Sequence, residues 1–404
     1  MLSINELKKY FVGKKVIVTG HTGFKGSYLC VLLKYLGAKV YGYSLKPVKN
    51  GLYDILNKDY KKYAKTHKSE NLKFVEKEIF ADIRDIKKAS NFILSVKPDY
   101  VIHMAAQPLV IRGYEEPHYT YDINVMGTVN VLEAIRNLMK INKNSKYRLS
   151  FLNVTTDKVY LNSDLKNYSF KENDKLCGHD PYANSKSCSE LVTYSYTKSF
   201  FDNDSRICVS TARAGNVIGG GDLNENRIIP DCYRAIKNHK TMFVRNPQSI
   251  RPYQYVLEPL ILYLNILAMQ NVNKKYEGNY NVGPDKKDCL TTKVLTEKFF
   301  ESIFDIVKTH SGELVLNKNN KSLKYDNKLT CDVVYNKSNS LSLKKEAKFL
   351  RLDNKLIKKV FKYNEIFTIK KTMEYTAQIY FDMLNNNNIY EGIFNIILKN
   401  GSVK

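Results

Sequence analysis

The chain has 404 residues, of which 43% are hydrophobic and 26% are charged, and its formal net charge is +24. These values indicate an ordinary soluble globular protein, long enough for one large α/β domain and a smaller one. The excess lysine is scattered along a chain that is also rich in Asn and Tyr, so we do not expect a nucleic-acid-binding protein. A basic surface would still help to capture an anionic nucleotide.

The cysteines and the apolar runs exclude further classes. Seven scattered cysteines without a CxxC motif predict reduced cytosolic thiols, with neither a disulfide framework nor a metal site. The first ten residues lack the apolar core of a signal peptide, and no run approaches ~18 apolar residues, so we expect a cytoplasmic protein without a membrane-spanning helix.

The predicted elements alternate between strand and helix. Residues 15–19 form an apolar strand, residues 20–26 turn it into a helix that runs to about Leu36, and residues 38–43 form the second strand. This βαβ unit implies a parallel sheet. Further strands are predicted at 72–78, 100–104, 147–155 and 207–214, and helices at 83–96, 119–139 and 182–201.

The fold class is therefore α/β, a doubly wound parallel sheet of the Rossmann type. We expect an NAD(P)-binding domain over residues 1–214 and a smaller, mainly substrate-binding portion over 215–404 that is interleaved with the sheet. Residues 310–343 are polar, rich in Asn and Lys and poorly periodic, which predicts a flexible, exposed insertion.

Three glycines follow the first strand, at Gly20, Gly23 and Gly26. In a dinucleotide site the first permits the tight turn, the second lets the backbone approach a pyrophosphate, and the third lets helix and strand pack closely. Asp82, after the third strand, is placed to accept a hydrogen bond from an adenine amino group, although it could instead cap the helix that follows.

The cofactor is predicted to be NAD, and NADP stays open. An NAD site usually has an acid at the end of the second strand, whereas this chain has Tyr43-Ser-Leu-Lys46. His103-Met-Ala-Ala-Gln107 closes the fourth strand with small residues, and Ala105 and Ala106 suit either the close approach of a flat cofactor or ordinary packing. His103 itself is predicted to be structural.

Tyr182-Ala-Asn-Ser-Lys186 carries the predicted chemistry. A tyrosine and a lysine four residues apart share one helix face, and a nearby ammonium favours the phenolate. Asp180-Pro181 is a helix-start signal. Thr156-Asp157-Lys158 ends a parallel strand, where ligands bind in open α/β sheets, although Asp157 and Lys158 could also form a solvated ion pair.

With these residues in place, the chain resembles the extended short-chain dehydrogenase/reductases and, within them, the CDP-glucose 4,6-dehydratases. The resemblance covers nearly the whole chain apart from residues 310–343. It is carried by Val18-Thr-Gly-His-Thr-Gly-Phe-Lys-Gly26, His103-Met-Ala-Ala-Gln-Pro-Leu109, Asn124-Val-Met-Gly-Thr128, Asp180-Pro-Tyr-Ala-Asn-Ser-Lys186, Ala212-Arg-Ala-Gly-Asn-Val-Ile-Gly-Gly-Gly-Asp222 and Val256-Leu-Glu-Pro-Leu260.

Asp157-Lys158 is the most diagnostic detail of the resemblance, because most similar 4,6-dehydratases have Asp-Glu there and the CDP-glucose branch has Asp-Lys. The chain departs from the family at Leu223, Tyr253 and Tyr255, which stand where the family usually has Trp, Trp and His.

The resemblance implies conversion of CDP-glucose to CDP-4-keto-6-deoxyglucose and water, with transient hydride transfer to NAD. Tyr182 would remove the C4 hydroxyl proton, Lys186 would lower the pKa of Tyr182 and bind the nicotinamide ribose, and Thr156 would donate to the same hydroxyl. Asp157, with a raised pKa, would protonate the leaving C6 hydroxyl. Lys158, with a lowered pKa, would take the C5 proton or, if charged, stabilise the enolate.

The resemblance also completes the predicted site. The cofactor set comprises Gly20, Thr22, Gly23, Phe24, Gly26, Asp82, Ile83, Ala105, Ala106, Gln107, Asn124, Tyr182 and Lys186, and the substrate set comprises Gln107, Asn216, Arg227 and Arg251. The two arginines suit bidentate phosphate contacts. We expect a homo-oligomer, a dimer or tetramer, with helices 119–139 and 182–203 at the interface, in the synthesis of a polysaccharide deoxysugar.

Three alternatives stay open. The substrate could be another nucleotide hexose, or the enzyme could be a sugar-nucleotide 4-epimerase or ketoreductase, against which Asp157-Lys158 argues. A non-catalytic NAD-binding scaffold would be expected to lack Tyr182 or Lys186, and both are present.

Overall fold

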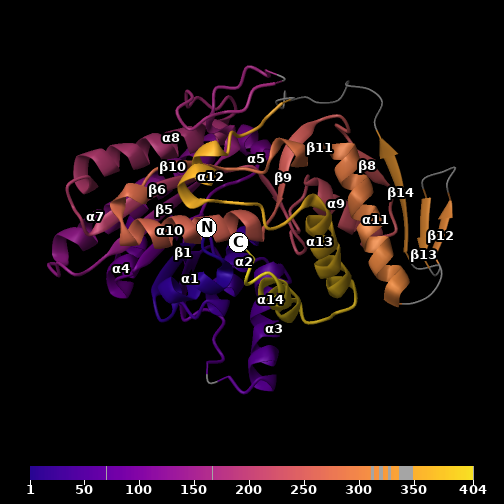
Figure 1. The fold of residues 1–404 in the computed structure, drawn as a ribbon, viewed down its shortest axis with the longest axis horizontal. Coiled ribbons are helices and arrows are strands. Elements are labelled where there is room, and N and C mark those ends of the chain that lie inside the picture. Colours follow the sequence, from indigo (N-terminus) through magenta and orange to yellow (C-terminus); the bar gives the residue numbers. More distant parts are fainter. Residues whose placement is uncertain are drawn as a thin grey trace.

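The computed structural model describes residues 1–69, 71–165, 167–310, 314–317, 322–325, 329–335 and 349–403. Its main sheet has seven parallel strands in the order β10-β6-β5-β4-β1-β2-β3. They are β1 (Lys15–Thr19), β2 (Lys39–Ser44), β3 (Lys77–Phe80), β4 (Tyr100–His103), β5 (Leu149–Thr156), β6 (Ile207–Ala214) and β10 (Asn279–Val282). Strands β10, β6, β5 and β1 of this sheet are labelled in Figure 1. The predicted doubly wound α/β fold is confirmed.

Helices cover both faces of this sheet. One face carries α1 (Ile4–Phe11), α2 (Phe24–Tyr35), α3 (Leu52–Thr66), α10 (Leu257–Val272) and α14 (Ile389–Lys399), and the other carries α4 (Ile86–Val96), α7 (Gly127–Ile141) and α8 (Pro181–Tyr196). The alternation along β1 builds both cores, because Val16 and Val18 enter the first cluster and Ile17 enters the second.

Two predicted helices contain π-helical turns. The segment predicted at 119–139 is preceded by α5 (Val110–Glu115), starts within α6 (Pro117–Tyr121), passes through a π-turn at Asp122–Met126 and continues as α7. The segment predicted at 182–201 is α8 followed by a π-turn at Thr197–Phe201. Both helices are present at the predicted positions.

The third strand is displaced from its predicted position at 72–78. Phe74 and Val75 are buried, but Phe74 packs against the rings of Tyr53 and Tyr60 on α3 instead of joining the ladder. Pairing with β2 starts only at Lys77, which is opposite Tyr41. The prediction was wrong here because the apolar run fills a helix-packing position.

The C-terminal part forms two small sheets and a third core. One sheet has the order β11-β9-β7 and the other β12-β13-β14-β8. The strands are β7 (Asn216–Ile218), β8 (Met242–Val244), β9 (Ile250–Tyr255), β11 (Cys289–Thr291), β12 (Leu314–Asn317), β13 (Ser322–Tyr325) and β14 (Leu329–Tyr335), and the helices are α9 (Ile228–Lys237), α11 (Thr292–His310), α12 (Lys355–Phe361) and α13 (Ile369–Leu384).

The range 310–343 thus contains three strands that the sequence pattern did not predict, and its other residues after His310 lie outside the described ones. Strand β10, from the C-terminal half, completes the main sheet beside β6. The division at 214/215 stays a prediction. Among the described helices, none has both the length and the apolar character needed to cross a bilayer.

Candidate active site

The predicted site residues converge on one edge of the main sheet. Because the strands are parallel, the loops that follow β1, β4, β5 and β6 all leave the sheet at its carboxyl edge. Thr156 is the last residue of β5, and Asp157 and Lys158 start the short 3-10 turn that follows it.

Helix α8 is fastened to the end of β5. Asp180 caps the helix by accepting a hydrogen bond from the Ala183 N–H at 2.9 Å, as its sequence signal predicted. Further along, the Lys186 ammonium donates to the Val154 carbonyl at 3.2 Å. The Ser187 hydroxyl donates at 2.8 Å to the carbonyl of Val159, the last residue of the 3-10 turn. These contacts bring the Tyr-x-x-x-Lys face of α8 to Thr156.

Tyr182 lies beside Thr156, but its titration differs from the expectation. Burial raises the pKa of Tyr182 to about 12, while the hydrogen bond with the Thr156 hydroxyl and the charge of Arg227 act to lower it. We expected Lys186 to bring this pKa down toward neutrality. In the structure desolvation outweighs the favourable charges, so Tyr182 holds its proton at neutral pH.

Lys186 shows the reverse effect. Its side chain is buried, and this burial, together with the charge of Lys25, lowers the pKa of Lys186 to about 7, while Glu190 acts to raise it. The ammonium is therefore only partly charged near neutral pH.

Asp157 is a buried acid with one unpartnered oxygen. Thr156 donates to its Oδ1 at 3.0 Å, and Oδ2 has no hydrogen-bond partner among the described residues. Burial raises the pKa of Asp157, against the lowering effects of Lys158, Thr156 and Arg251. The raised pKa agrees with the direction that a general acid requires. The role of Lys158 as a base stays a prediction.

The glycine loop has the geometry of a dinucleotide cradle. Gly20 has a φ of +74°, and a Cβ there would lie 2.9 Å from the Ala105 nitrogen. A Cβ on Gly26 would lie 2.3 Å from the Gly20 carbonyl oxygen, so close packing requires glycine. Gly23 is exposed at the start of α2, and its Cβ would meet only the Gly20 oxygen, at 3.4 Å. The protein itself does not demand glycine at Gly23, which leaves the approach of a ligand to explain it.

The neighbouring loop residues are held from the second strand. The Thr22 and Ser44 hydroxyls lie 2.7 Å apart, and Thr22 also donates to the Leu45 carbonyl at 3.1 Å. Phe24 packs edge-on against Tyr28. Thr22 thus ties the loop to the end of β2, where no acid is present.

Gln107 and Asn124 are occupied by internal hydrogen bonds. The Gln107 side chain donates to Leu109 and Thr120 and accepts from the Leu109 N–H. Asn124 accepts from the Gln107 N–H at 2.9 Å and donates to Ser185 on α8 at 2.9 Å. Both amides therefore position the loop after β4 against α8. Ala105 and Ala106 are half-buried in that loop.

Asp82 does not cap a helix, because α4 starts at Ile86 and its cap is Asp85. The carboxylate of Asp82 accepts three hydrogen bonds from Arg84, and these hold the pKa of Asp82 below its usual range. Ile83 is buried and lies where a Cβ on Gly127 would meet it, at 2.7 Å. Contact of these residues with an adenine ring stays a prediction.

The predicted substrate residues border the acid from the C-terminal part. Asn216 starts β7 and follows Gly215. Gly215 lies close to the acid, because a Cβ added to it would be 3.3 Å from Asp157 Oδ2. Arg251 is buried on β9, and its charge reaches Asp157. Arg227 lies 3.5 Å from the carboxylate of Asp222, and its charge reaches Tyr182.

Lys25 is a member of the site that the sequence analysis missed. Burial and the charge of Arg227 lower the pKa of Lys25 to about 8, while Asp157 acts to raise it. A lysine in the first turn of a helix opposes the helix dipole, and that unfavourable placement in Phe24-Lys-Gly26 was the available signal.

Two further observations delimit the site. Tyr255, which replaces the family histidine, is completely buried among the rings of Tyr28, Phe367 and Tyr375, so it is a core residue. Among the residues with described placement, no group of three or more His, Cys, Asp or Glu side chains could hold a metal ion.

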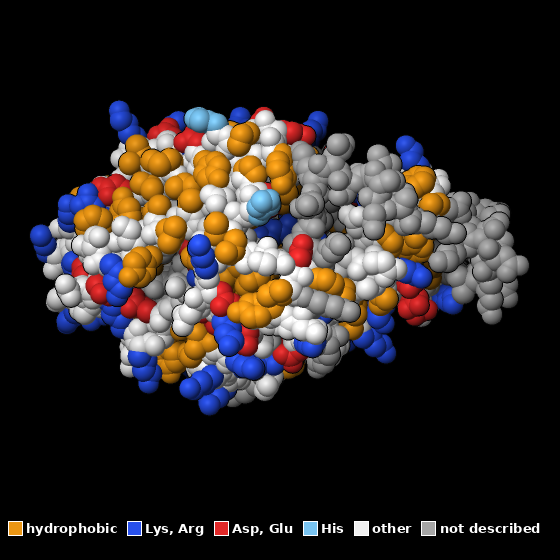
Figure 2. Space-filling view, turned by 90° about the horizontal axis from the view of Figure 1, so that it is seen from above, with side chains coloured by type: hydrophobic (Ala, Val, Ile, Leu, Met, Phe, Trp, Pro, Cys, Tyr) orange, Lys and Arg blue, Asp and Glu red, His pale blue; other side chains and the backbone are white. Residues whose placement is uncertain are grey.

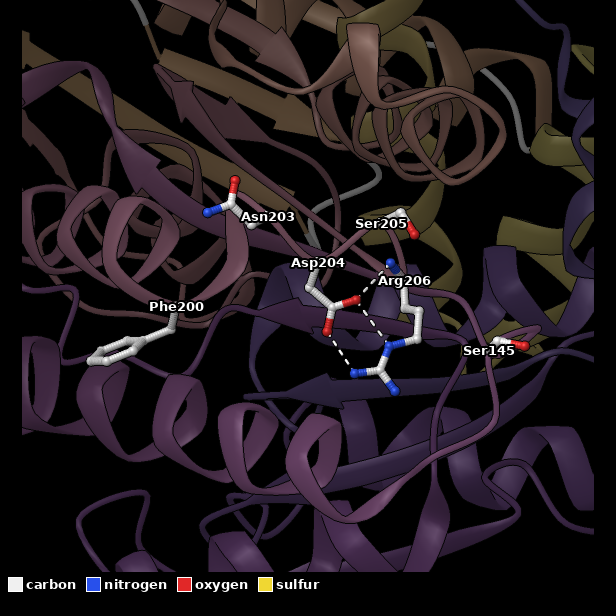
Figure 3. Close-up of a pocket in the computed structure, with 6 residues that line it drawn as sticks. All are labelled: Ser145, Phe200, Asn203, Asp204, Ser205 and Arg206. Atoms are coloured by element: carbon white, nitrogen blue, oxygen red, sulfur yellow. Dashed lines mark hydrogen bonds and ion pairs between the residues drawn. The ribbon is translucent and has the colours of Figure 1, made fainter.

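A shallow pocket lies at the opposite edge of the sheet. Its lining residues are Ser145, Phe200, Asn203, Asp204, Ser205 and Arg206 (Figure 3). They come directly before β5 and β6, at the amino ends of these strands. This pocket is therefore separate from the candidate active site, which lies at the carboxyl edge of the sheet. Seen from above, the middle of the molecule has a recess with basic side chains at its bottom (Figure 2).

The parallel sheet, the glycine loop after β1 and the Tyr182–Lys186 pair beside the end of β5 define a dehydrogenase/reductase of the extended short-chain class. The model of the GDP-mannose 4,6 dehydratase family matches residues 17–376. A CDP-glucose 4,6-dehydratase from Salmonella typhimurium is 39% identical over 297 residues, which are 72% of this chain and 77% of that relative. The chain therefore belongs to this family of sugar-nucleotide 4,6-dehydratases.

Solved structures share the fold at low sequence identity. A dTDP-glucose 4,6-dehydratase from Streptomyces venezuelae, solved with NAD, has a TM-score of 0.68 at 18% identity and covers 93% of this chain and 99% of its own. A UDP-glucose 4-epimerase from Thermotoga maritima has a TM-score of 0.65 at 17% identity and covers 91% and 99%.

Proposed function

We propose that this chain removes water from a sugar nucleotide, converting CDP-glucose to CDP-4-keto-6-deoxyglucose with NAD as the cofactor. The observation that carries the proposal is the buried acid Asp157, whose pKa is raised, hydrogen-bonded to Thr156 beside Tyr182. An epimerase or a simple reductase needs no protonated acid beside the redox pair, whereas loss of a hydroxyl group does.

The residues present fit a dinucleotide. The strand-to-helix turn at Gly20 to Gly26 leaves room at the exposed Gly23 for a pyrophosphate at the start of α2. NAD, when bound, supplies a hydride acceptor and returns the hydride, so the reaction has no net redox change. Lys186 and the small residues Ala105 and Ala106 would hold its nicotinamide end.

Tyr182 would accept the proton of the C4 hydroxyl. For this its pKa must fall from about 12, and Thr156 and Arg227 already act in that direction. Lys186, once protonated, adds a positive charge on the same helix face, which would lower the pKa of Tyr182 further. Thr156 would orient the hydroxyl by donating a hydrogen bond to it.

Asp157 would supply the proton to the leaving C6 hydroxyl, and Lys158 would take the proton from C5, so that one water molecule leaves. Arg227, Arg251 and Asn216 border the same space and would bind the diphosphate and the sugar. Lys25 adds a further positive charge near Asp157.

A product assay tests the proposal. The purified protein is incubated with CDP-glucose and NAD, and the keto sugar is measured by its absorbance in alkali. GDP-, UDP- and dTDP-hexoses serve as competing substrates, and NADP replaces NAD in a parallel series because β2 ends without an acid. Inversion at C4 without loss of water would refute dehydration and support an epimerase.

A matched variant separates catalysis from a scaffold role. Tyr182→Phe keeps the ring that packs at the site and removes only the hydroxyl, so dehydration is expected to fall by a factor of roughly 10³ or more. Activity equal to wild type in this variant would show that the proposed chemistry is wrong.

We also propose a cytoplasmic homo-oligomer that associates through α7 and α8. Exposed apolar residues gather there, including Ile141 (67% exposed), Leu191 (54%), Tyr194 (61%) and Phe200 (50%). Light scattering of the wild type and of Leu191→Lys/Tyr194→Lys tests this proposal. A wild type that stays monomeric at all concentrations would refute it.

A further inference from the structure

A buried ion pair lies directly behind the active site. Arg213 on β6 and Glu190 on α8 each have a side chain that is 2% exposed. The guanidinium Nε donates to both carboxylate oxygens at 2.9 Å, and Nη2 donates to Oε2 at 2.5 Å. Three charge-assisted contacts therefore link the two buried side chains.

The carboxylate of Glu190 connects three parts of the catalytic edge. It lies one helical turn after Lys186, on the same face of α8. Its Oε1 also accepts a hydrogen bond from the Thr155 hydroxyl on β5 at 2.6 Å. Thr155 directly precedes Thr156, so one carboxylate fixes the Tyr-x-x-x-Lys helix relative to the strand that carries the acid.

Arg213 extends this network to strand β10 and to the segment that follows the 3-10 turn at Asp157. Its Nη1 donates to the Tyr160 hydroxyl and to the Glu172 carbonyl, each at 2.7 Å, and Tyr160 donates to Asn281 on β10 at 2.6 Å. The ring of Tyr160 stacks on Phe170. The Arg213–Glu190 pair therefore joins α8, β5, β6, β10 and the segment that follows the 3-10 turn at Asp157–Val159.

Stability alone does not account for this arrangement. A buried ion pair is often no more stabilising than apolar side chains of the same volume, because both charges lose their hydration. The geometry of the network and the charge of Glu190 toward Lys186 offer a reason for keeping it.

We propose that Glu190, held by Arg213, is a positioning residue of the active site: it fixes α8 against the end of β5 and supplies the negative charge that faces Lys186. Three groups surround Lys186 from different elements. Lys25 on α2 acts to lower the pKa of Lys186, Glu190 on α8 acts to raise it, and His103 on β4 is neutral because burial lowers the pKa of His103 to about 3. Glu190 is the negative group among them.

The inference rests on the proposed dehydration, and the test separates the two. In Glu190→Met/Arg213→Met both charges are replaced together, so that neither is left buried alone. The matched control, Asp204→Asn/Arg206→Met, removes an ion pair at the other end of β6, whose oxygen and nitrogen lie 2.7 Å apart (Figure 3). Melting temperature, kcat, KM and the pH dependence of both NAD binding and kcat are measured for each protein.

We expect the Glu190/Arg213 double variant to fold, to lose at least about tenfold in kcat with KM changed less than about threefold, and to shift the alkaline limb of its pH profile downward by roughly half a unit or more. The sign follows because, of the two charges removed, Glu190 is the one that acts to raise the pKa of Lys186, so Lys186 loses its proton at lower pH in the variant. The control variant is expected to keep the wild-type profile.

A folded double variant with wild-type kcat and pH profile would overturn the proposal. If the double variant does not fold, Thr155→Val decides, since it removes only the hydroxyl that binds Glu190. A wild-type kcat in Thr155→Val would then overturn the proposal, and a tenfold loss at unchanged KM would support it. If the wild-type protein dehydrates no sugar nucleotide, the proposed function fails, and the pH dependence of NAD binding still tests the effect of Glu190 on Lys186.

Discussion

Replacing Lys186 by methionine should stabilise the fold while it abolishes activity. The ammonium is buried, and the pKa of Lys186 is lowered from 10.5 to about 7, so the folded state carries a cost for the charged form that the unfolded chain does not. Methionine has a similar length and no charge. The variant tests directly whether burial of the catalytic lysine lowers the stability of the folded protein.

The magnitude follows from linkage between the two pKa values. At pH 7 the shift corresponds to about 4 kcal/mol of unfavourable free energy in the folded state, and at pH 9 to about 2 kcal/mol. The lost hydrogen bond to the Val154 carbonyl offsets roughly 1 kcal/mol. We therefore expect Lys186→Met to be about 3 kcal/mol more stable than wild type at pH 7 and about 1 kcal/mol more stable at pH 9.

The sign of the pH dependence is fixed. The unfolded chain binds more protons than the folded one between the two pKa values, so the wild type gains stability as pH rises from about 7 toward 10.5 and Lys186→Met lacks this gain. The assay is urea unfolding at pH 7, 8 and 9, with exposed Lys198→Met as the control, which is expected to differ from wild type by less than about 0.5 kcal/mol.

A stability difference that does not change with pH, or a Lys186→Met variant that is less stable than wild type at pH 7, would refute the reasoning. The first result would mean that Lys186 titrates normally in the folded state. The second would mean that its hydrogen bond outweighs the cost of burial.

Three further predictions use other parts of the site. Gly26→Ala should destabilise the fold by about 2 kcal/mol or more because its Cβ would lie 2.3 Å from the Gly20 oxygen, whereas Gly23→Ala should keep the melting temperature within a few degrees and weaken NAD binding measured by calorimetry. Asp157→Asn should lower keto-sugar formation by roughly 10² and accumulate reduced nicotinamide absorbance with substrate, since only water loss is blocked; equal loss of both signals would contradict the acid role. Lys25→Met should shift the alkaline limb of kcat upward, because the charge of Lys25 lowers the pKa of Lys186; an unchanged profile would exclude that coupling.

The parts of the fold that the sequence predicted are those set by local patterns. The strand 15–19, the glycine turn and the start of α8 each depend on hydrophobic periodicity, a positive φ at Gly20 or the cap by Asp180. Since parallel strands share their carboxyl edge, Asp157 and Tyr182 could be expected to meet once the elements were placed.

The parts that the sequence missed depend on tertiary approach. Lys25 joins the site because the turn at the start of α2 lies next to the segment from Gly215 to Arg227, which no local pattern indicates. The hydrogen bonds that Asn124 makes with the Gln107 backbone and with Ser185 likewise could not be predicted from local patterns, and contact of Gln107 and Asn124 with a ligand stays a prediction. The pKa of Tyr182 was expected to be low because its neighbour on the helix was counted and its burial was not.

Burial acts in one direction on four groups of the site and favours the uncharged form of each. It raises the pKa values of Asp157 and Tyr182 and lowers those of Lys25 and Lys186, to about 8 and about 7, so each of these four groups is shifted toward its uncharged form. Groups whose proton affinities have been brought closer together exchange protons at low cost. The proposed reaction takes protons from C5 and from the C4 hydroxyl and delivers one to the C6 hydroxyl. It needs this property because proton transfer to or from a fully charged residue changes the charge of the buried site, which costs free energy. The same argument explains why Glu190 matters, since its negative charge acts to raise the pKa of Lys186 against the lowering effects of burial and of Lys25.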